Sequence, residues 1–250
     1  MEVPPGLPPD LWDRMADYLR GLDRSLGARP AAVLVISGHW ETEHPTLNTG
    51  VQPPLLFDYY GFPAHTYRLT YPARGSPSVA ARVRELLGAA GIASAEDGER
   101  GLDHGVFVPF KLIYPEADVP IVQLSLNRNL DAATHLQIGR ALTPLREECV
   151  LIVGSGMSYH NLRDFYASDR RAVAAAEEFD NWLCAAVTDS GARDSRLSQW
   201  QSAPGARDCH PRPEHLLPLM VAAGAGGSDL ARRTFHDRLL GKPIAGFRFG

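Results

Sequence analysis

The sequence predicts one α/β domain with a central, mostly parallel mixed sheet flanked by helices. Three short apolar runs, at 31–37, 119–126 and 150–153, are rich in β-branched residues, which is typical of strands buried on both faces. Segments with helical spacing separate these runs, and strands that alternate with helices favour a doubly wound arrangement. Because 250 residues suffice for one hydrophobic core, we treat residues 1–250 as a single domain.

Apolar periodicity predicts the helices. The segment 9–26 places four apolar residues at helical spacing: Leu11, Met15, Leu19 and Leu22. Further helices are predicted at 76–90, 131–145, 170–189 and 213–225, and another follows the turn at 101–105 and ends near 114–115. A short strand is predicted near residue 92 and an edge strand at 247–250. Residues 52–75 interleave prolines with aromatic residues, so we expect a loop that lines a pocket for a flat ligand.

The composition narrows the class of protein. Hydrophobic residues make up 44% and charged residues 22%, as in ordinary globular proteins. A formal charge of −4 argues against a nucleic-acid partner, because binding phosphates requires a dense basic surface. Residues 1–15 lack the regions of a signal peptide, no run of about 18 apolar residues predicts a membrane span, and the three cysteines fit no disulfide framework. We therefore expect a cytoplasmic protein that binds a small molecule, and the composition allows a homo-oligomer.

Four histidines occupy positions that suit a functional site. His39 and His160 each follow a predicted buried strand, and ligands of open α/β sheets bind beyond the carboxyl ends of the strands. His104 lies in a turn bounded by glycines, whose backbone freedom allows its side chain to point inward. His215 begins a predicted helix after a proline-rich segment. Imidazoles that converge at this edge could hold a metal, but the spacings match no local metal motif, so a metal site and structural roles both stay open.

The remaining polar candidates carry weaker signals. Four further histidines are expected at the surface or in local caps: His44, His65, His135 and His236. His210 stays open because it lies close to His215. Glu41 and Asp103 are each expected either to orient a neighbouring imidazole or to cap a loop or turn. The Gly-Ser-Gly at 154–156 matches neither a phosphate-binding loop nor a nucleophile elbow.

Six stretches together resemble a known family. They are VISGHWE (35–41), YYGFP to YPARG (59–75), GLDHGVFVPF (101–110), VPIVQLSL (119–126), GSGMSYHNL (154–162) and HPRPEHLLPL (210–219). In this order they resemble the class III extradiol aromatic ring-opening dioxygenases, specifically the DODA-type, DOPA-dioxygenase-like branch, which is related to the catalytic subunit of protocatechuate 4,5-dioxygenase. The resemblance extends over nearly the whole chain and implies an α/β fold.

The resemblance also implies a site and a reaction. His39 and His215 match metal ligands of the family, which holds Fe(II), with Zn(II) in its place in some structures. His160 matches the acid/base histidine, which is sometimes counted as a metal contact, and His104 matches a histidine beside substrate and oxygen. The expected reaction is cleavage of a catechol ring by O2 at the bond beside the two hydroxyl groups. Three residues are expected to line the substrate pocket: Tyr59, Tyr60 and Phe62.

One feature of the family has no counterpart. Its members begin with a strand and a His-Gly-rich motif that supplies another metal ligand, and this motif precedes a helix like the one predicted at 9–26. We therefore expect the domain in residues 1–250 to lack that strand and histidine, and a start codon set too far downstream is favoured over a true loss.

Two other functions use the same histidines. A zinc hydrolase would activate a metal-bound water and would work under nitrogen. A non-enzymatic binding protein, comparable to the Memo-like relatives of the family, would retain the scaffold without turnover. The missing first histidine is the main support for the second alternative.

Overall fold

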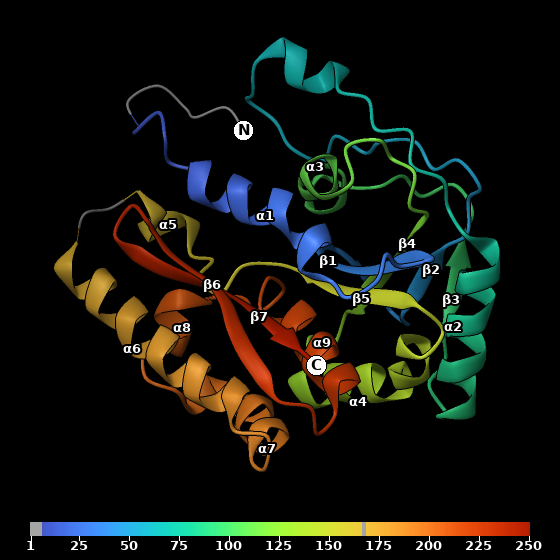
Figure 1. The fold of residues 1–250 in the computed structure, drawn as a ribbon. Coiled ribbons are helices and arrows are strands. Elements are labelled where there is room, and N and C mark those ends of the chain that lie inside the picture. The colour runs from blue at the N-terminus through green and yellow to red at the C-terminus, as the bar shows by residue number, and fades with distance from the viewer. Residues whose placement is uncertain (1–6, 167–168) are drawn as a thin grey trace.

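A five-stranded sheet forms the centre of the molecule, as the computed structural model of residues 7–166 and 169–250 shows (Figure 1). Its strand order is β3-β2-β4-β1-β5. The three predicted strands are parallel neighbours: β1 (Ala32–Thr42), β4 (Ile121–Asn127) and β5 (Val150–Ser155). β2 (Thr46–Asn48) runs antiparallel to β4, and β3 (Ala95–Asp97) runs parallel to β2. The prediction of a mostly parallel mixed sheet in a single α/β domain is confirmed.

Helices cover both faces of the sheet, because successive side chains of β1 point to opposite sides. Val33 and Val35 pack with α1 (Asp13–Ser25) and α3 (His104–Ile113). Leu34 and Ile36 pack on the other face, against three helices: α2 (Pro77–Ala89), α4 (Ala132–Ala141) and α9 (Leu217–Gly226). Four more helices complete the second side: α5 (Leu162–Phe165), α6 (Arg170–Thr188), α7 (Arg193–Ser198) and α8 (Ala206–Cys209). Three short 3-10 helices lie at Ala64–Arg68, Thr143–Arg146 and Trp200–Ser202.

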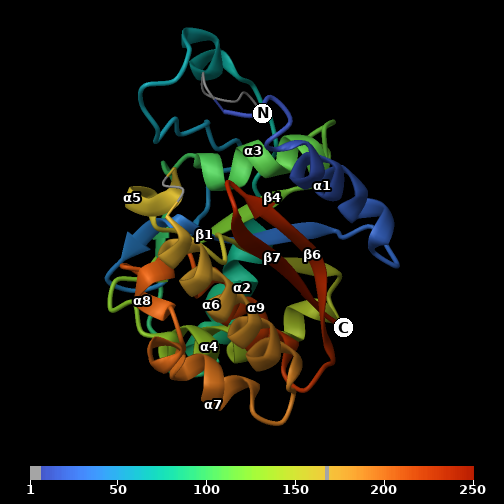
Figure 2. The ribbon, with the colours of Figure 1, turned by 90° about the vertical axis from the view of Figure 1, so that its left-hand side faces the viewer.

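Some predicted elements differ from the observed ones. The strand expected near residue 92 is β3, which begins at Ala95, and the helix expected at 131–145 ends at Ala141 and continues as a 3-10 turn, because Pro144 has no backbone N–H to extend it. The edge strand predicted at 247–250 is confirmed for residues 247–249, but it begins earlier and lies outside the central sheet. These residues belong to β7 (Lys242–Phe249), which pairs with β6 (Ala231–Leu239) in a separate hairpin beside the sheet, between α1 and α6 (Figure 2).

The first strand is longer than predicted and irregular. β1 continues to Thr42, and its pairing with β4 shifts register between Ile36 and Glu41. His39 lies in this bulge, whereas the sequence placed it beyond the end of the strand. Bulges redirect side chains, so the irregularity determines where the His39 imidazole points.

β5 ends the sheet on one side. Among the described residues no strand pairs with its outer edge. A groove of about 940 Å³ runs along this edge, between α1, α9 and the β6–β7 hairpin, and reaches the side chains of His39, His104, His160 and His215. The predicted additional strand and histidine lie outside the described residues and stay a prediction. In the part of the chain that the structure describes, no helix combines the length and apolar character needed to cross a membrane.

Candidate active site

Four imidazoles form a row at one end of the sheet. The rings of His104 and His39 have centroids 3.9 Å apart, those of His39 and His215 4.7 Å apart, and those of His215 and His160 3.4 Å apart. They come from the start of α3, the β1 bulge, the segment before α9 and the segment after β5. The structure therefore brings together the four histidines that the sequence selected.

A buried hydrogen-bond network supports the bulge that carries His39. The Ser37 hydroxyl accepts a hydrogen bond from the His39 backbone N–H and donates one to Asp103. The Asp103 carboxylate also accepts from the Gln123 side chain, and its burial raises its pKa, an effect that the hydrogen bonds from Ser37 and Gln123 partly offset. Asp103 precedes α3 but its side chain does not cap the helix. Both roles expected for Asp103 were therefore wrong, since it supports the segment of His39 and not His104.

Glycines allow the backbone segments of the site to approach one another. A Cβ atom at Gly105 would lie 2.7 Å from Cδ2 of His39, and one at Gly156 would lie 2.1 Å from the backbone oxygen of His215. At Gly38 it would lie 3.0 Å from the backbone oxygen of Glu214. Gly105 has ordinary helical geometry within α3. Its importance therefore lies in the space it leaves, and not in the backbone freedom that the sequence suggested.

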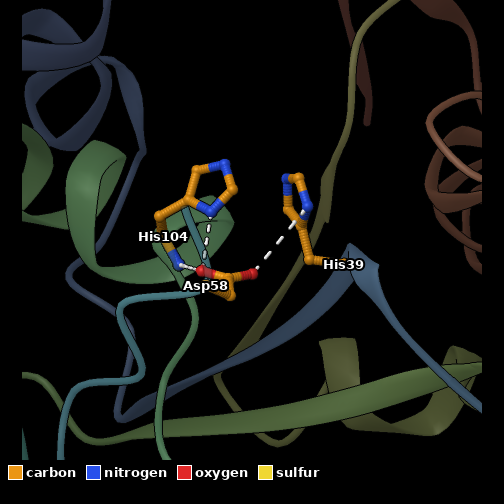
Figure 3. Close-up of side chains that lie close together, drawn as sticks. All are labelled: His39, Asp58 and His104. Carbon is orange, nitrogen blue, oxygen red and sulfur yellow. Dashed lines mark hydrogen bonds and ion pairs between the residues drawn. The ribbon is translucent and has the colours of Figure 1, made fainter. Parts of the chain in front are cut away.

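Asp58 holds His104 from outside its helix (Figure 3). One oxygen of its carboxylate accepts a hydrogen bond from the His104 backbone N–H at 3.0 Å and lies 2.7 Å from Nδ1 of the same residue. The other oxygen lies 4.0 Å from Nδ1 of His39. Burial would raise the pKa of this carboxyl, but hydrogen bonds from His104 outweigh the burial and lower it. Sequence reasoning missed Asp58, although it is the one acidic residue between positions 52 and 75.

Glu214 contacts the imidazoles at the other end of the row, as Asp58 contacts His104. Its Oε1 lies 3.0 Å from Nδ1 of His215 and 3.3 Å from Nδ1 of His160. Burial would raise the pKa of Glu214, but hydrogen bonds from His160 and His215 lower it strongly. Glu41, which the sequence suggested for this role or for a loop cap, instead forms a two-pronged ion pair with Arg212 at 2.6 and 2.5 Å. The signal for Glu214 was its position directly before His215.

The protonation state of His39 and His215 suits metal binding. Burial, reinforced by the neighbouring His104 and His215 rings, lowers the pKa of His39 to about 3. Burial also lowers the pKa of His215. Both rings are therefore neutral near pH 7 and keep a lone pair for a ligand. The donor atoms form two sets, and within each set they lie within 4.8 Å of one another. One set is His39, Asp58 and His104, and the other is His160, Glu214 and His215. These residues fit a divalent metal ion.

The three aromatic candidates differ in position. The Tyr59 ring contacts His104 edge-on, with centroids 5.6 Å apart, and its hydroxyl donates to the backbone oxygen of Thr66. Phe62 is half-exposed and packs against Tyr59. The Tyr60 side chain is 91% exposed. The structure therefore brings Tyr59 to the imidazole row and directs Tyr60 into solvent.

The other histidines lie outside the row. His44, His65 and His236 are exposed, as predicted. For His135, expected at the surface or in a local cap, the surface position was wrong because the residue is fully buried. It bonds locally to the Asp131 carbonyl and the Asn127 N–H, in agreement with the second alternative. His210 is also fully buried, and its Nε2–H donates to the backbone oxygen of Ser158, so its role is to hold the segment that leads to His160.

Comparison with known proteins decides the family. The model of the LigB family, described as the catalytic LigB subunit of aromatic ring-opening dioxygenase, matches residues 2–248. This chain belongs to the LigB family. LigB-family dioxygenases depend on a metal, in agreement with the donor set described above.

Known relatives of this LigB-family chain define the reaction type. A 4,5-DOPA dioxygenase extradiol from Portulaca grandiflora is 42% identical over 226 residues, which cover 88% of this chain and 83% of the relative. The corresponding protein of Beta vulgaris is 40% identical over 216 residues, with 86% and 80% covered. A crystal structure of an uncharacterized Escherichia coli K12 protein matches with a TM-score of 0.78 and 30% identity, covering 94% of this chain and 92% of that one. The LigB-family chain is an extradiol ring-opening dioxygenase, and the comparisons support neither the hydrolase nor the Memo-like alternative.

His210 gives a prediction for stability. Burial lowers its pKa from 6.5 to about 4, so the unfolded chain takes up a proton in this window that the folded chain excludes. The free energy of unfolding should therefore fall as the pH drops from 6.5 to 4, by up to about 3 kcal/mol from this residue. Urea unfolding at pH 7 and pH 4 should show a smaller difference in His210→Gln than in the unsubstituted protein. An equal difference in the two proteins would contradict this assignment.

Proposed function

We propose that this extradiol dioxygenase uses Fe(II) to cleave a catechol that carries a side chain, in the manner of DOPA, with Zn(II) able to occupy the same site. The observation that supports the metal is the row of four contacting imidazoles, of which His39 and His215 are kept neutral by burial. The substrate class rests on relatives named 4,5-DOPA dioxygenase extradiol. The site stands at one end of the groove beside β5.

The proposed roles follow from the position of each residue. His39 and His215 are neighbours in the middle of the row and are the metal ligands. His160, at one end, takes the proton of a substrate hydroxyl and later returns a proton, and it also lies close enough to the ligands for a direct metal contact. His104, at the other end, donates a hydrogen bond to bound oxygen or to the anionic substrate.

His39 and His215 would hold Fe(II), which would supply the redox chemistry that links the diol to O2. The protein keeps the acid/base imidazole and the oxygen-facing imidazole on opposite sides of the metal ligands. Asp58 fixes the orientation of His104 by accepting from its ring and its backbone N–H. The Tyr59 ring beside His104 forms one wall of the substrate pocket, with Phe62 behind it and Tyr60 at the rim.

We also propose that residues 1–250 form the catalytic domain without its first strand, and that one further strand and histidine complete the metal site. The support is the outer edge of β5, whose backbone groups have no strand partner among the described residues, together with the groove that leads from this edge to the imidazoles. If this is correct, a protein translated with the upstream codons should bind zinc more tightly than residues 1–250. Equal zinc dissociation constants in a competition titration would contradict the missing ligand.

The metal roles predict different effects of three substitutions. His39→Ala and His215→Ala should each reduce the iron bound after anaerobic reconstitution, because they remove ligands. His160→Ala should retain iron but lose at least about 100-fold in turnover, because it removes the acid/base group. Iron content, oxygen uptake and the yellow ring-opened product are measured with DOPA or caffeate in air. Equal iron loss in all three variants would make His160 a metal ligand, and turnover with Zn(II) under nitrogen would favour a hydrolase.

The aromatic residues predict a difference in substrate binding. Tyr59→Ala should raise the KM for the catechol several-fold, because the Tyr59 ring stands against His104. Tyr60→Ala should change the KM by less than a factor of two, because its side chain is largely in solvent. Steady-state oxygen uptake over a range of catechol concentrations measures both values. A larger rise in KM for Tyr60→Ala than for Tyr59→Ala would contradict the proposed position of Tyr59 in the pocket wall.

A further inference from the structure

We infer that Glu214 is a positioning residue that keeps the ring proton of both His160 and His215 on Nδ1, and that Arg212 and Glu41 hold it in place. This inference rests on the proposed function, in which His215 is a ligand and His160 the acid/base group. It gives Glu214 a role distinct from metal coordination, although its carboxylate lies within reach of the same donor set.

The first argument is the geometry around one oxygen atom. Oε1 of Glu214 lies 3.0 Å from Nδ1 of His215 and 3.3 Å from Nδ1 of His160. The two rings are stacked with an interplanar angle of 17°. An ionised carboxylate only accepts hydrogen bonds, so the hydrogen bond to His215 and the close contact with His160 both favour an Nδ1–H facing this oxygen. With its proton on Nδ1, an imidazole carries its lone pair on Nε2, which is the atom left for a metal or for a substrate proton.

The second argument is the support on the far side of the carboxylate. Arg212 forms a bidentate pair with Glu41, and its NH1 lies 3.4 Å from Oε2 of Glu214. Glu41 belongs to β1, two residues after His39, so the guanidinium connects the strand of His39 to the segment of His215. The positive charge also balances the Glu214 carboxylate, which is only 9% exposed. The position of Glu214 is thus fixed relative to both proposed ligands.

The same contacts argue against coordination by Glu214. A metal ion at Oε1 would meet the Nδ1 protons of two imidazoles, and a metal ion at Oε2 would face the Arg212 guanidinium. At either oxygen of Glu214, a metal cation would therefore be repelled by a positive charge or by N–H groups. A carboxylate in this position is suited to orient ligands, as carboxylates commonly do behind metal-bound histidines.

The experiment combines histidine tautomers with zinc affinity. Long-range proton–nitrogen NMR spectra of protein labelled with 15N-histidine identify the ring nitrogen that carries the proton. We expect Nδ1–H in His160 and His215 of the unsubstituted protein, with and without Zn(II). In Glu214→Ala we expect at least one ring to lose this preference, and the zinc dissociation constant to rise about 10- to 100-fold with unchanged stoichiometry at saturation.

A second variant and a control distinguish a specific effect of Glu214 on tautomers and zinc affinity from a loss of folding. Arg212→Gln leaves the carboxylate in place, so it should retain both Nδ1–H tautomers and weaken zinc binding less than Glu214→Ala does. Glu43→Gln alters an exposed carboxylate just beyond the end of β1 and should change neither quantity. Thermal unfolding of each variant identifies any loss of structure.

Several results would overturn the inference. They are Nε2–H tautomers in the unsubstituted protein, an unchanged zinc affinity in Glu214→Ala, or a loss of one zinc per chain at saturation, which would make Glu214 a ligand. The tautomers are recorded without catechol or oxygen. Failure of ring cleavage would therefore refute the proposed substrate chemistry and leave the assignment of Glu214 standing.

Discussion

The contact between four imidazoles is the constraint on which the site depends. His104, His39, His215 and His160 come from four separate segments, and each ring touches the next. Neighbouring buried imidazoles repel one another when protonated, and burial already lowers the pKa of His39 to about 3. Burial therefore keeps His39 and His215, in the middle of the row, neutral. Carboxylates at the two ends accept hydrogen bonds without removing the lone pairs that a metal requires.

The surrounding fold maintains this arrangement by close backbone contacts. The β1 bulge directs His39, and the buried Ser37 and Asp103 hold that bulge. Gly105 and Gly156 leave the space in which His39 and the backbone of His215 lie. A side chain at either glycine would push one imidazole away from its neighbours, so the geometry of the site depends on residues that never touch a substrate.

The sequence predicts the parts of this structure that local patterns determine. β1, β4 and β5 were found because strands buried on both faces are continuous apolar runs, whereas β2 has only three residues and β6 is rich in charged residues that face solvent. The four histidines were found from strand ends and family motifs. Asp58 and Glu214 were missed, because tertiary packing decides which carboxylate meets which ring. Glu41 and Asp103, chosen for their nearness in sequence to His39 and His104, point elsewhere because the bulge and the start of α3 turn them away.

The location of the metal ion is the most direct test of the account. Crystals soaked with Zn(II) and measured at the zinc absorption edge give the ion's position from its anomalous signal. The account predicts one ion at about 2.0–2.1 Å from an imidazole nitrogen of both His39 and His215. An ion bound away from these two residues, or no ordered ion at saturating zinc, would contradict it.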